Sequence, residues 1–140
     1  MKGVLKAPIK IEIDKIKSDI TNKIDALDKI TYGQIETTDL VRPSQYNLFS
    51  LAKIGNIAQL VFDCSLDETK SFATFQANRI AKLPNNFCPI SKMSNSFSFR
   101  NGDWAYFTLN LDGEIIIQPF TSIREHATFS VSLSYIVKKE

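Results

Sequence analysis

The chain has 140 residues, of which 44% are hydrophobic, and a formal net charge of +2; this composition suits one folded domain and argues against disorder. The small, dispersed charge excludes the basic face of a nucleic-acid-binding protein, and the short apolar runs exclude insertion into a membrane. Two cysteines and one histidine are too few for a disulfide framework or a structural zinc site.

The N-terminal segment MKGVLKAPIKIEIDK contains lysines but lacks the continuous apolar stretch of a signal peptide. We therefore expect the chain to be made in the cytosol, or to be a fragment of a longer protein. Pro8 has no amide hydrogen to donate, so we expect no uninterrupted helix from the start. The alternation in IKIEI, residues 9–13, favours a short strand there.

A heptad pattern then predicts a helix before Gly33. The apolar a and d positions are Ile13, Ile16, Ile20, Leu27 and Ile30. Such a narrow apolar seam is typical of a coiled coil, and isoleucine at both positions favours three or four strands over two. We expect residues 1–32 to form a trimeric coiled-coil stalk; the alternative is one amphipathic helix packed on the domain that follows.

After Gly33 the hydrophobic period becomes two, which predicts strands. The segment TFSVSLSYIV, residues 128–137, places its apolar residues on one face and its serines on the other. In DWAYFTLNL, residues 103–111, the inner face would carry Ala105, Phe107, Leu109 and Leu111. EIIIQPF, residues 114–120, is apolar on both faces, which suits a strand covered on both sides.

Turn residues separate these segments. Asn56 predicts a turn between two strands in residues 46–64, and the pairs Asn101-Gly102 and Asp112-Gly113 predict type I′ turns. Several short strands with no helical period between them favour an antiparallel β-sandwich or jelly-roll-like head over residues 33–140. The fold class that we expect is therefore mainly β, with an N-terminal helix.

Residues 79–90, RIAKLPNNFCPI, contain a corner between two apolar runs. Pro84 cannot donate to a strand ladder, and it favours an extended conformation at Leu83. The two asparagines that follow tolerate turn conformations. We expect Phe87 and Pro89 to turn back and cap the open end of the sandwich, so the predicted role of the corner is structural.

Four segments occur in order: LAKIGNIAQLVFD, RIAKLPNNFCPI, NGDWAYFTLNLDGEIIIQPF and FSVSLSYIV. Their combination resembles the C-terminal head of bacteriophage tail-fibre and baseplate receptor-binding proteins, from about Leu51 to Val137. The resemblance implies a homotrimer on a short coiled coil that attaches the virion to a bacterial cell-wall or surface polysaccharide. It also implies a virion tail-tip location, synthesis in the host cytoplasm, and contacts with other baseplate or tail proteins through the N-terminus.

No residue pattern indicates catalysis. His126 is the sole histidine, and Cys64 and Cys88 lie in apolar segments, so we expect no Cys–His pair. We interpret the acidic residues of DCSLDETK as a solvated surface loop; these are Asp63, Asp67 and Glu68. We expect a non-enzyme that needs no cofactor or metal.

Saccharide sites combine an exposed aromatic ring with hydrogen-bonding groups, because a sugar ring has an apolar face and polar hydroxyls. The candidate saccharide-binding residues are Trp104, Tyr106, Asp103, Arg100, Arg124 and His126. In the family that the chain resembles, the glycan site often lies between subunits. Such a site could include both the cluster around Trp104 and the cluster of Arg124 and His126. The alternatives are burial of Trp104 and Tyr106, between the sheets or at a subunit interface, and a plain loop role for His126.

A second interpretation keeps the same architecture without a ligand. The chain would then be a structural trimerisation or assembly domain of a phage baseplate or tail fibre. A third is a trimeric jelly-roll domain unrelated to phage.

Overall fold

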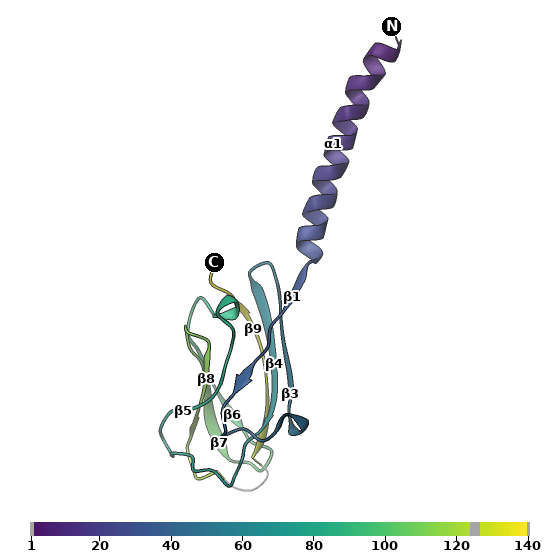
Figure 1. Ribbon diagram of the computed structural model, residues 1–140. Helices are drawn as coiled ribbons and strands as arrows, with labels where there is room; N and C mark the ends of the chain where they lie inside the picture. The colour runs from purple at the N-terminus through teal and green to yellow at the C-terminus, as the bar shows by residue number, and fades with distance from the viewer. Residues whose placement is uncertain (1, 124–126, 140) are drawn as a thin grey trace.

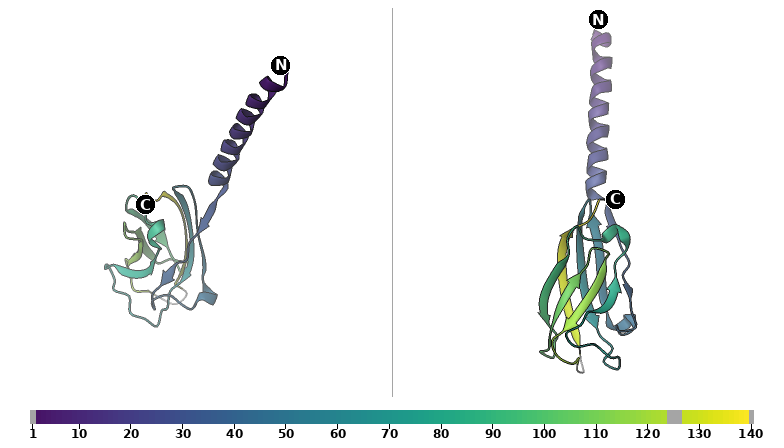
Figure 2. Two further views of the ribbon diagram at one scale, coloured as in Figure 1. Left: turned by 45° about the horizontal axis from the view of Figure 1, so that its top comes forward. Right: turned by 90° about the vertical axis from the view of Figure 1, so that its left-hand side faces the viewer.

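The computed structural model describes residues 2–123 and 127–139, without the side chains of residues 2–8, 25–28 and 44. A long helix, α1 (Lys2–Asp28), projects from a two-sheet β head (Figure 1). In the right-hand view of Figure 2, the helix continues the long direction of the head. We call the end of the head next to α1 the proximal end, and the opposite end the distal end.

The helix runs through Pro8, so the expected break and the short strand over residues 9–13 are wrong. A proline inside a helix removes one backbone hydrogen bond. The other hydrogen bonds of this 27-residue helix hold it together on both sides of Pro8. The alternating isoleucines therefore lie on a helix, where Ile9, Ile11 and Ile13 are all exposed.

The predicted stalk seam is exposed along α1. Ile13, Ile16 and Ile20 are 46%, 52% and 52% exposed, and every described side chain from residue 9 to 24 is exposed. The alternative of a helix packed on the head of the same chain is therefore wrong. Leu27 lies in α1, but its side chain is outside the described part.

The seam does not reach Ile30, because α1 ends at Asp28 and Ile30 begins a strand. That strand, β1 (Ile30–Tyr32), pairs with the head, although it lies before the predicted boundary at residues 32 and 33. The division into a stalk over 1–32 and a head over 33–140 stays a prediction.

The head is a mainly β, antiparallel sandwich, as predicted. One sheet has the order β1-β3-β4-β9, with β3 (Leu48–Ile54), β4 (Ile57–Ser65) and β9 (Thr128–Ile136). The other has the order β2-β5-β8-β7-β6, with β2 (Glu36–Thr37), β5 (Asn78–Lys82), β8 (Glu114–Pro119), β7 (Trp104–Leu109) and β6 (Met93–Ser98). Short 3-10 helices lie at η1 (Ser44–Tyr46) and η2 (Asn85–Phe87).

Alternating side chains from both sheets form the core, and several of them are phenylalanines. Phe62 of β4 lies 6.2 Å from Phe107 of β7 and 6.0 Å from Phe129 of β9, between ring centres. The serines of β9 point outward, as the period-two pattern predicts. Offset and tilted ring pairs of this kind add stability beyond the burial of apolar area.

Two details of the strands differ from expectation. β8 is not covered on both sides: Ile115 and Ile117 are fully buried, whereas Ile116 is only partly buried on the outer face. Among the described residues, no third layer of helices or strands covers this sheet. Leu111 is 46% exposed, since β7 ends at Leu109 and the chain turns there.

The predicted type I′ turns are wrong. A type I′ turn needs positive φ at both central residues, but Gly102 and Gly113 have φ of 91° and 85° while Asn101 and Asp112 do not have positive φ. The amide of Gly102 donates to the oxygen of Phe99 at 2.9 Å, and Gly113 makes the corresponding bond to Asn110 at 3.0 Å. Both are therefore three-residue loops with glycine at a G1 bulge.

Side chains explain that choice of turn. Oδ1 of Asn101 accepts from the amide of Asp103 at 2.9 Å, and Oδ1 of Asp112 accepts from the amide of Glu114 at 3.0 Å. Asn and Asp stabilise such turns by bonding to the backbone two residues later.

The corner at residues 79–90 is structural, as predicted, and it closes the proximal end of the sandwich. Phe87 is fully buried, and its carbonyl oxygen accepts from the hydroxyl of Tyr135 at 2.9 Å. The amide of Ile90 donates a hydrogen bond of 2.9 Å to the carbonyl oxygen of Ile136, which joins the corner to the end of β9 in the opposite sheet. Gly33 lies against it, because a Cβ there would be 2.7 Å from a ring carbon of Phe87.

Candidate functional site

Trp104 and Tyr106 lie on the outer face of β7, and both are exposed: Trp104 by 55% and Tyr106 by 42%. Burial between the sheets is thus not what the structure shows. The ring of Tyr106 meets that of Phe120 edge to face, with centres 4.8 Å apart, and Phe120 is followed by Phe75 at 6.3 Å. We call these four side chains, Trp104, Tyr106, Phe120 and Phe75, the aromatic strip.

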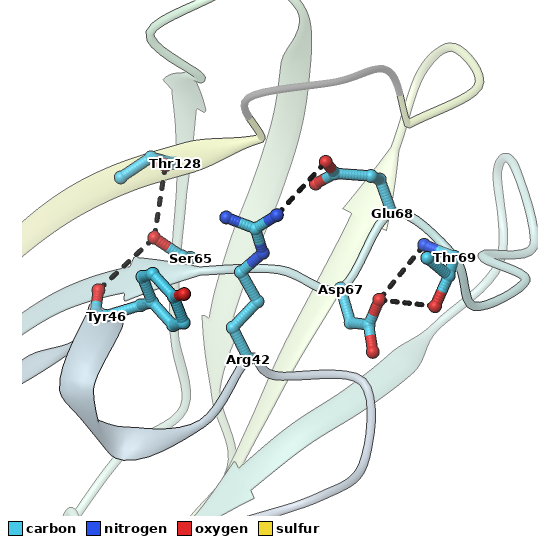
Figure 3. Close-up of polar contacts among 7 residues, drawn as sticks. All are labelled: Arg42, Tyr46, Ser65, Asp67, Glu68, Thr69 and Thr128. Atoms are coloured by element: carbon cyan, nitrogen blue, oxygen red, sulfur yellow. Dashed lines mark hydrogen bonds and ion pairs between the residues drawn. The ribbon is translucent and has the colours of Figure 1, made fainter.

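A polar hollow of about 320 Å³ opens at the distal end, at the edge of the other sheet. The residues that line it include Tyr46, Asn47, Asp63, Ser65, Arg100 and Thr128. Most of these polar groups bond within the chain: the Ser65 hydroxyl lies 3.2 Å from that of Thr128 and donates to the carbonyl oxygen of Tyr46 at 3.2 Å (Figure 3). Most polar side chains of the hollow therefore already have a partner within the chain.

Beside the hollow, Arg42 lies between the ring of Tyr46 and the carboxylate of Glu68 (Figure 3). Its guanidinium carbon is 5.1 Å from the Tyr46 ring centre, and Nη2 is 3.3 Å from Oε1 of Glu68. Hydrogen bonds from the hydroxyl and amide of Thr69 lower the pKa of Asp67. Asp67 and Glu68 follow β4 as a surface segment, but Asp63 lies on β4 itself.

The structure separates the predicted saccharide residues. Arg100 lines the hollow, where Nη2 is 3.7 Å from Oδ2 of Asp63, rather than joining Trp104 on the aromatic strip. Asp103 is only 8% exposed, and its backbone closes the turn before β7. Arg124 and His126 lie outside the described residues.

Sequence reasoning missed Phe75 and Phe120. Phe120 is the last residue of the predicted strand over residues 114–120, and it follows β8 in the structure. Its position opposite Trp104 depends on the pairing of β7 with β8, whose register places Ala105 opposite Pro119. No periodic pattern surrounds Phe75, so the sequence holds no signal for it.

An apolar row crosses the proximal end of the first sheet on its outer face. Ile30 pairs with Ile54, Ile54 with Ile57, and Ile57 with Ile136, which places one isoleucine on each strand; we call these the isoleucine row. They are 46%, 47%, 60% and 49% exposed. A shallow hollow of about 540 Å³, also lined by Tyr32, adjoins the row.

Neither cysteine lies in surroundings that would make its thiol a nucleophile. Cys64 and Cys88 are buried, and desolvation raises the pKa of both thiols, so they stay protonated near neutral pH. Within residues 2–123 and 127–139, no group of His, Cys, Asp and Glu side chains has the arrangement of a metal site. None of the described helices is long and apolar enough to cross a membrane.

No protein-family model matches the chain, and no curated protein matches it. Among solved structures, the chain is similar to the receptor binding protein (gp15) of Listeria phage PSA, with a TM-score of 0.62 and 14% sequence identity. The alignment covers 94% of this chain and 79% of that one. At this identity the similarity shows a shared fold.

Proposed function

We propose that this protein is a non-catalytic receptor-binding protein of a bacteriophage tail tip or baseplate, which attaches the virion to a saccharide of the bacterial cell surface as a homotrimer. The observation that carries the proposal is the fold similarity to a phage receptor binding protein over 94% of the chain. The ordered segments between about Leu51 and Val137 give independent support, because they resemble the heads of the same class of protein.

The trimer is supported by apolar surface that the single chain leaves uncovered. The isoleucines of α1 are exposed, and the isoleucine row begins at Ile30, directly after α1 ends at Asp28. Exposed contiguous apolar surface marks an interface, and oligomers of one chain usually have closed symmetry. Three copies would bury the α1 seams in a coiled coil and bring the isoleucine rows next to its base.

The distal end is the part of the head that such an assembly would present to a cell. The helix leaves from the proximal end (Figure 1), so the N-terminus would face the other tail proteins. The aromatic strip begins with Trp104 at the distal end of β7, and the hollow with Arg100 lies at the same end. A saccharide site there would use exposed rings together with hydrogen-bonding side chains, and Arg124 and His126 stay candidates for it.

Adhesion of the fluorescently labelled protein to a panel of bacteria, competed with purified cell-wall polysaccharides, tests the proposal. Wild type is expected to adhere to at least one strain and to be displaced by the polysaccharide of that strain. Trp104→Ala should reduce adhesion, whereas Leu111→Ala, at another exposed apolar residue, in the proximal turn, should not. Adhesion to no strain would favour the structural assembly domain instead.

A further inference from the structure

We propose that Phe75 extends the aromatic strip into a platform for an uncharged saccharide, on which the apolar face of a pyranose ring stacks. This inference rests on the proposed function and deepens it in two ways: it adds a residue to the site, and it names the chemical class of the ligand. The argument depends on the backbone of Phe75, the continuity of the rings, and the charge of their surroundings.

Phe75 has φ of 61°, in the left-handed region that a bulky residue rarely adopts. Such strain persists where the surrounding structure holds it, and it is common at binding sites. The ring is 63% exposed, so burial of the side chain does not offset the cost.

Hydrogen bonds on both sides hold this backbone. The amide of Phe75 donates to the carbonyl oxygen of Pro119 at 2.8 Å, and its own oxygen accepts from Nε2 of Gln118 at 2.9 Å. The buried side chain of Asn78 ties down the same loop, with bonds to the amide of Ala73 at 3.1 Å and to the oxygen of Gln76 at 2.9 Å. The loop is therefore pre-organised, with the ring of Phe75 held outside the core.

Three of the four rings are in contact, and Trp104 lies next to them on the same face. Phe120 lies between Phe75 and Tyr106, with centre-to-centre distances of 6.3 Å and 4.8 Å. The amide of Phe120 donates to the oxygen of Trp104 at 3.0 Å, so Trp104 lies beside Phe120 on the adjacent strand. A rigid aromatic surface needs little further ordering when a ligand binds.

The residues paired with the strip are uncharged. Ser98 is opposite Trp104, Ser96 is opposite Tyr106, and Gln118 is opposite Tyr106 on the other side. Farther along the sheet, Arg79 and Glu114 form an ion pair of 2.9 Å, and Glu36 and Lys82 are cross-strand partners of opposite charge. Hydroxyl and amide groups beside exposed rings suit a neutral sugar, whereas an anionic polymer would need arginine or lysine.

The chain contains one tryptophan, so the indole N–H signal of Trp104 in NMR reports on the strip alone. We would titrate the full chain with neutral sugars (glucose, galactose, rhamnose and N-acetylglucosamine), with glucuronic acid as an anionic comparator and glycerol as a control for non-specific effects. The expected result is a saturable shift with at least one neutral sugar and none with glycerol. No shift with any neutral sugar, or a shift with glucuronic acid alone, would overturn the proposal.

Phe75→Gly removes the ring while retaining the backbone, because glycine adopts positive φ without strain. Its unfolding temperature should equal or exceed that of wild type, and its affinity for the sugar should fall about five- to tenfold. Phe75→Tyr, which keeps a ring, should bind as wild type does; Phe75→Asn, which tolerates positive φ, provides a second ring-free variant. Equal affinity in wild type and both ring-free variants would overturn the role of Phe75.

The two proposals fail in distinguishable ways. If wild type adheres to bacteria and Phe75→Gly adheres equally well, the platform is wrong and the receptor-binding role stands. If the wild-type protein adheres to no strain but neutral sugars still shift the Trp104 signal, the platform stands and the receptor-binding role is wrong.

Discussion

The hydroxyl of Tyr135 donates a hydrogen bond of 2.9 Å to the carbonyl oxygen of Phe87, and both residues are buried. This bond joins the end of one sheet to the corner that closes the other. Two positions far apart in the sequence thus hold the proximal end of the head together.

Tyr135→Phe tests that bond. Removing the hydroxyl leaves a buried carbonyl without its donor, so we expect the free energy of unfolding to fall by about 1–2 kcal/mol. Tyr106→Phe, on the exposed face of β7, should change it by less than about 0.5 kcal/mol. Urea denaturation followed by circular dichroism measures both, and equal stability of the two variants would show that the bond contributes nothing.

Stability should also fall at alkaline pH. Burial raises the pKa of Tyr135 above its ordinary value, and the nearby Cys88 adds to the effect. A group whose pKa is raised by folding contributes stability that is present below its unfolded pKa, about 10 for tyrosine, and is lost as pH rises above that value. Wild type should therefore lose stability more steeply than Tyr135→Phe above about pH 10, and identical slopes in the two proteins would contradict this assignment.

The two G1-bulge glycines should differ in their tolerance of a side chain. Gly102→Ala should cost about 1–2 kcal/mol from the left-handed backbone alone, because nothing lies within 4 Å of its Cβ position. Gly113→Ala should cost more, since its Cβ would be 3.0 Å from the oxygen of Leu83 and 3.1 Å from the sulfur of Cys88. Thermal unfolding of the two variants measures the difference, and a less stable Gly102→Ala would reverse the expectation.

The isoleucine row should contribute to self-association. Ile57→Lys places a charge in the middle of the row, so we expect the trimer to dissociate at least about tenfold more readily on dilution. Leu48→Lys makes the same change at the distal end of the same sheet, where the side chain is 67% exposed. Sedimentation velocity over a dilution series compares the association of the two variants. If Leu48→Lys weakens association and Ile57→Lys does not, another surface forms the interface.

The sequence predicts the sandwich well, because period-two alternation in residues 128–137 decides which side chains enter the core. It predicts the turn positions but not their type, since side-chain bonds from Asn101 and Asp112 favour a bulge over a type I′ turn. Pro8 does not end α1, because one missing hydrogen bond is small beside the others of a long helix.

The candidate site was only partly predictable. Alternation alone places Trp104 and Tyr106 on an outer face, but the neighbours on that face depend on register. Arg100 is only four residues before Trp104 in the sequence, yet the intervening turn directs it to the other sheet, where it meets Asp63. The isoleucine row could not be predicted, because it depends on how four strands pair. The position of Phe75 depends on a loop conformation that no local sequence pattern indicates.

Trimer formation underlies the receptor-binding proposal, because a monomer leaves the isoleucines of α1 and the isoleucine row with nothing to pack against. The most direct test is the mass of the wild-type protein in solution, measured by light scattering on a sizing column. A mass of about three times 15.8 kDa is the predicted result. A single species of 15.8 kDa would contradict both the stalk and the association of heads through the isoleucine row.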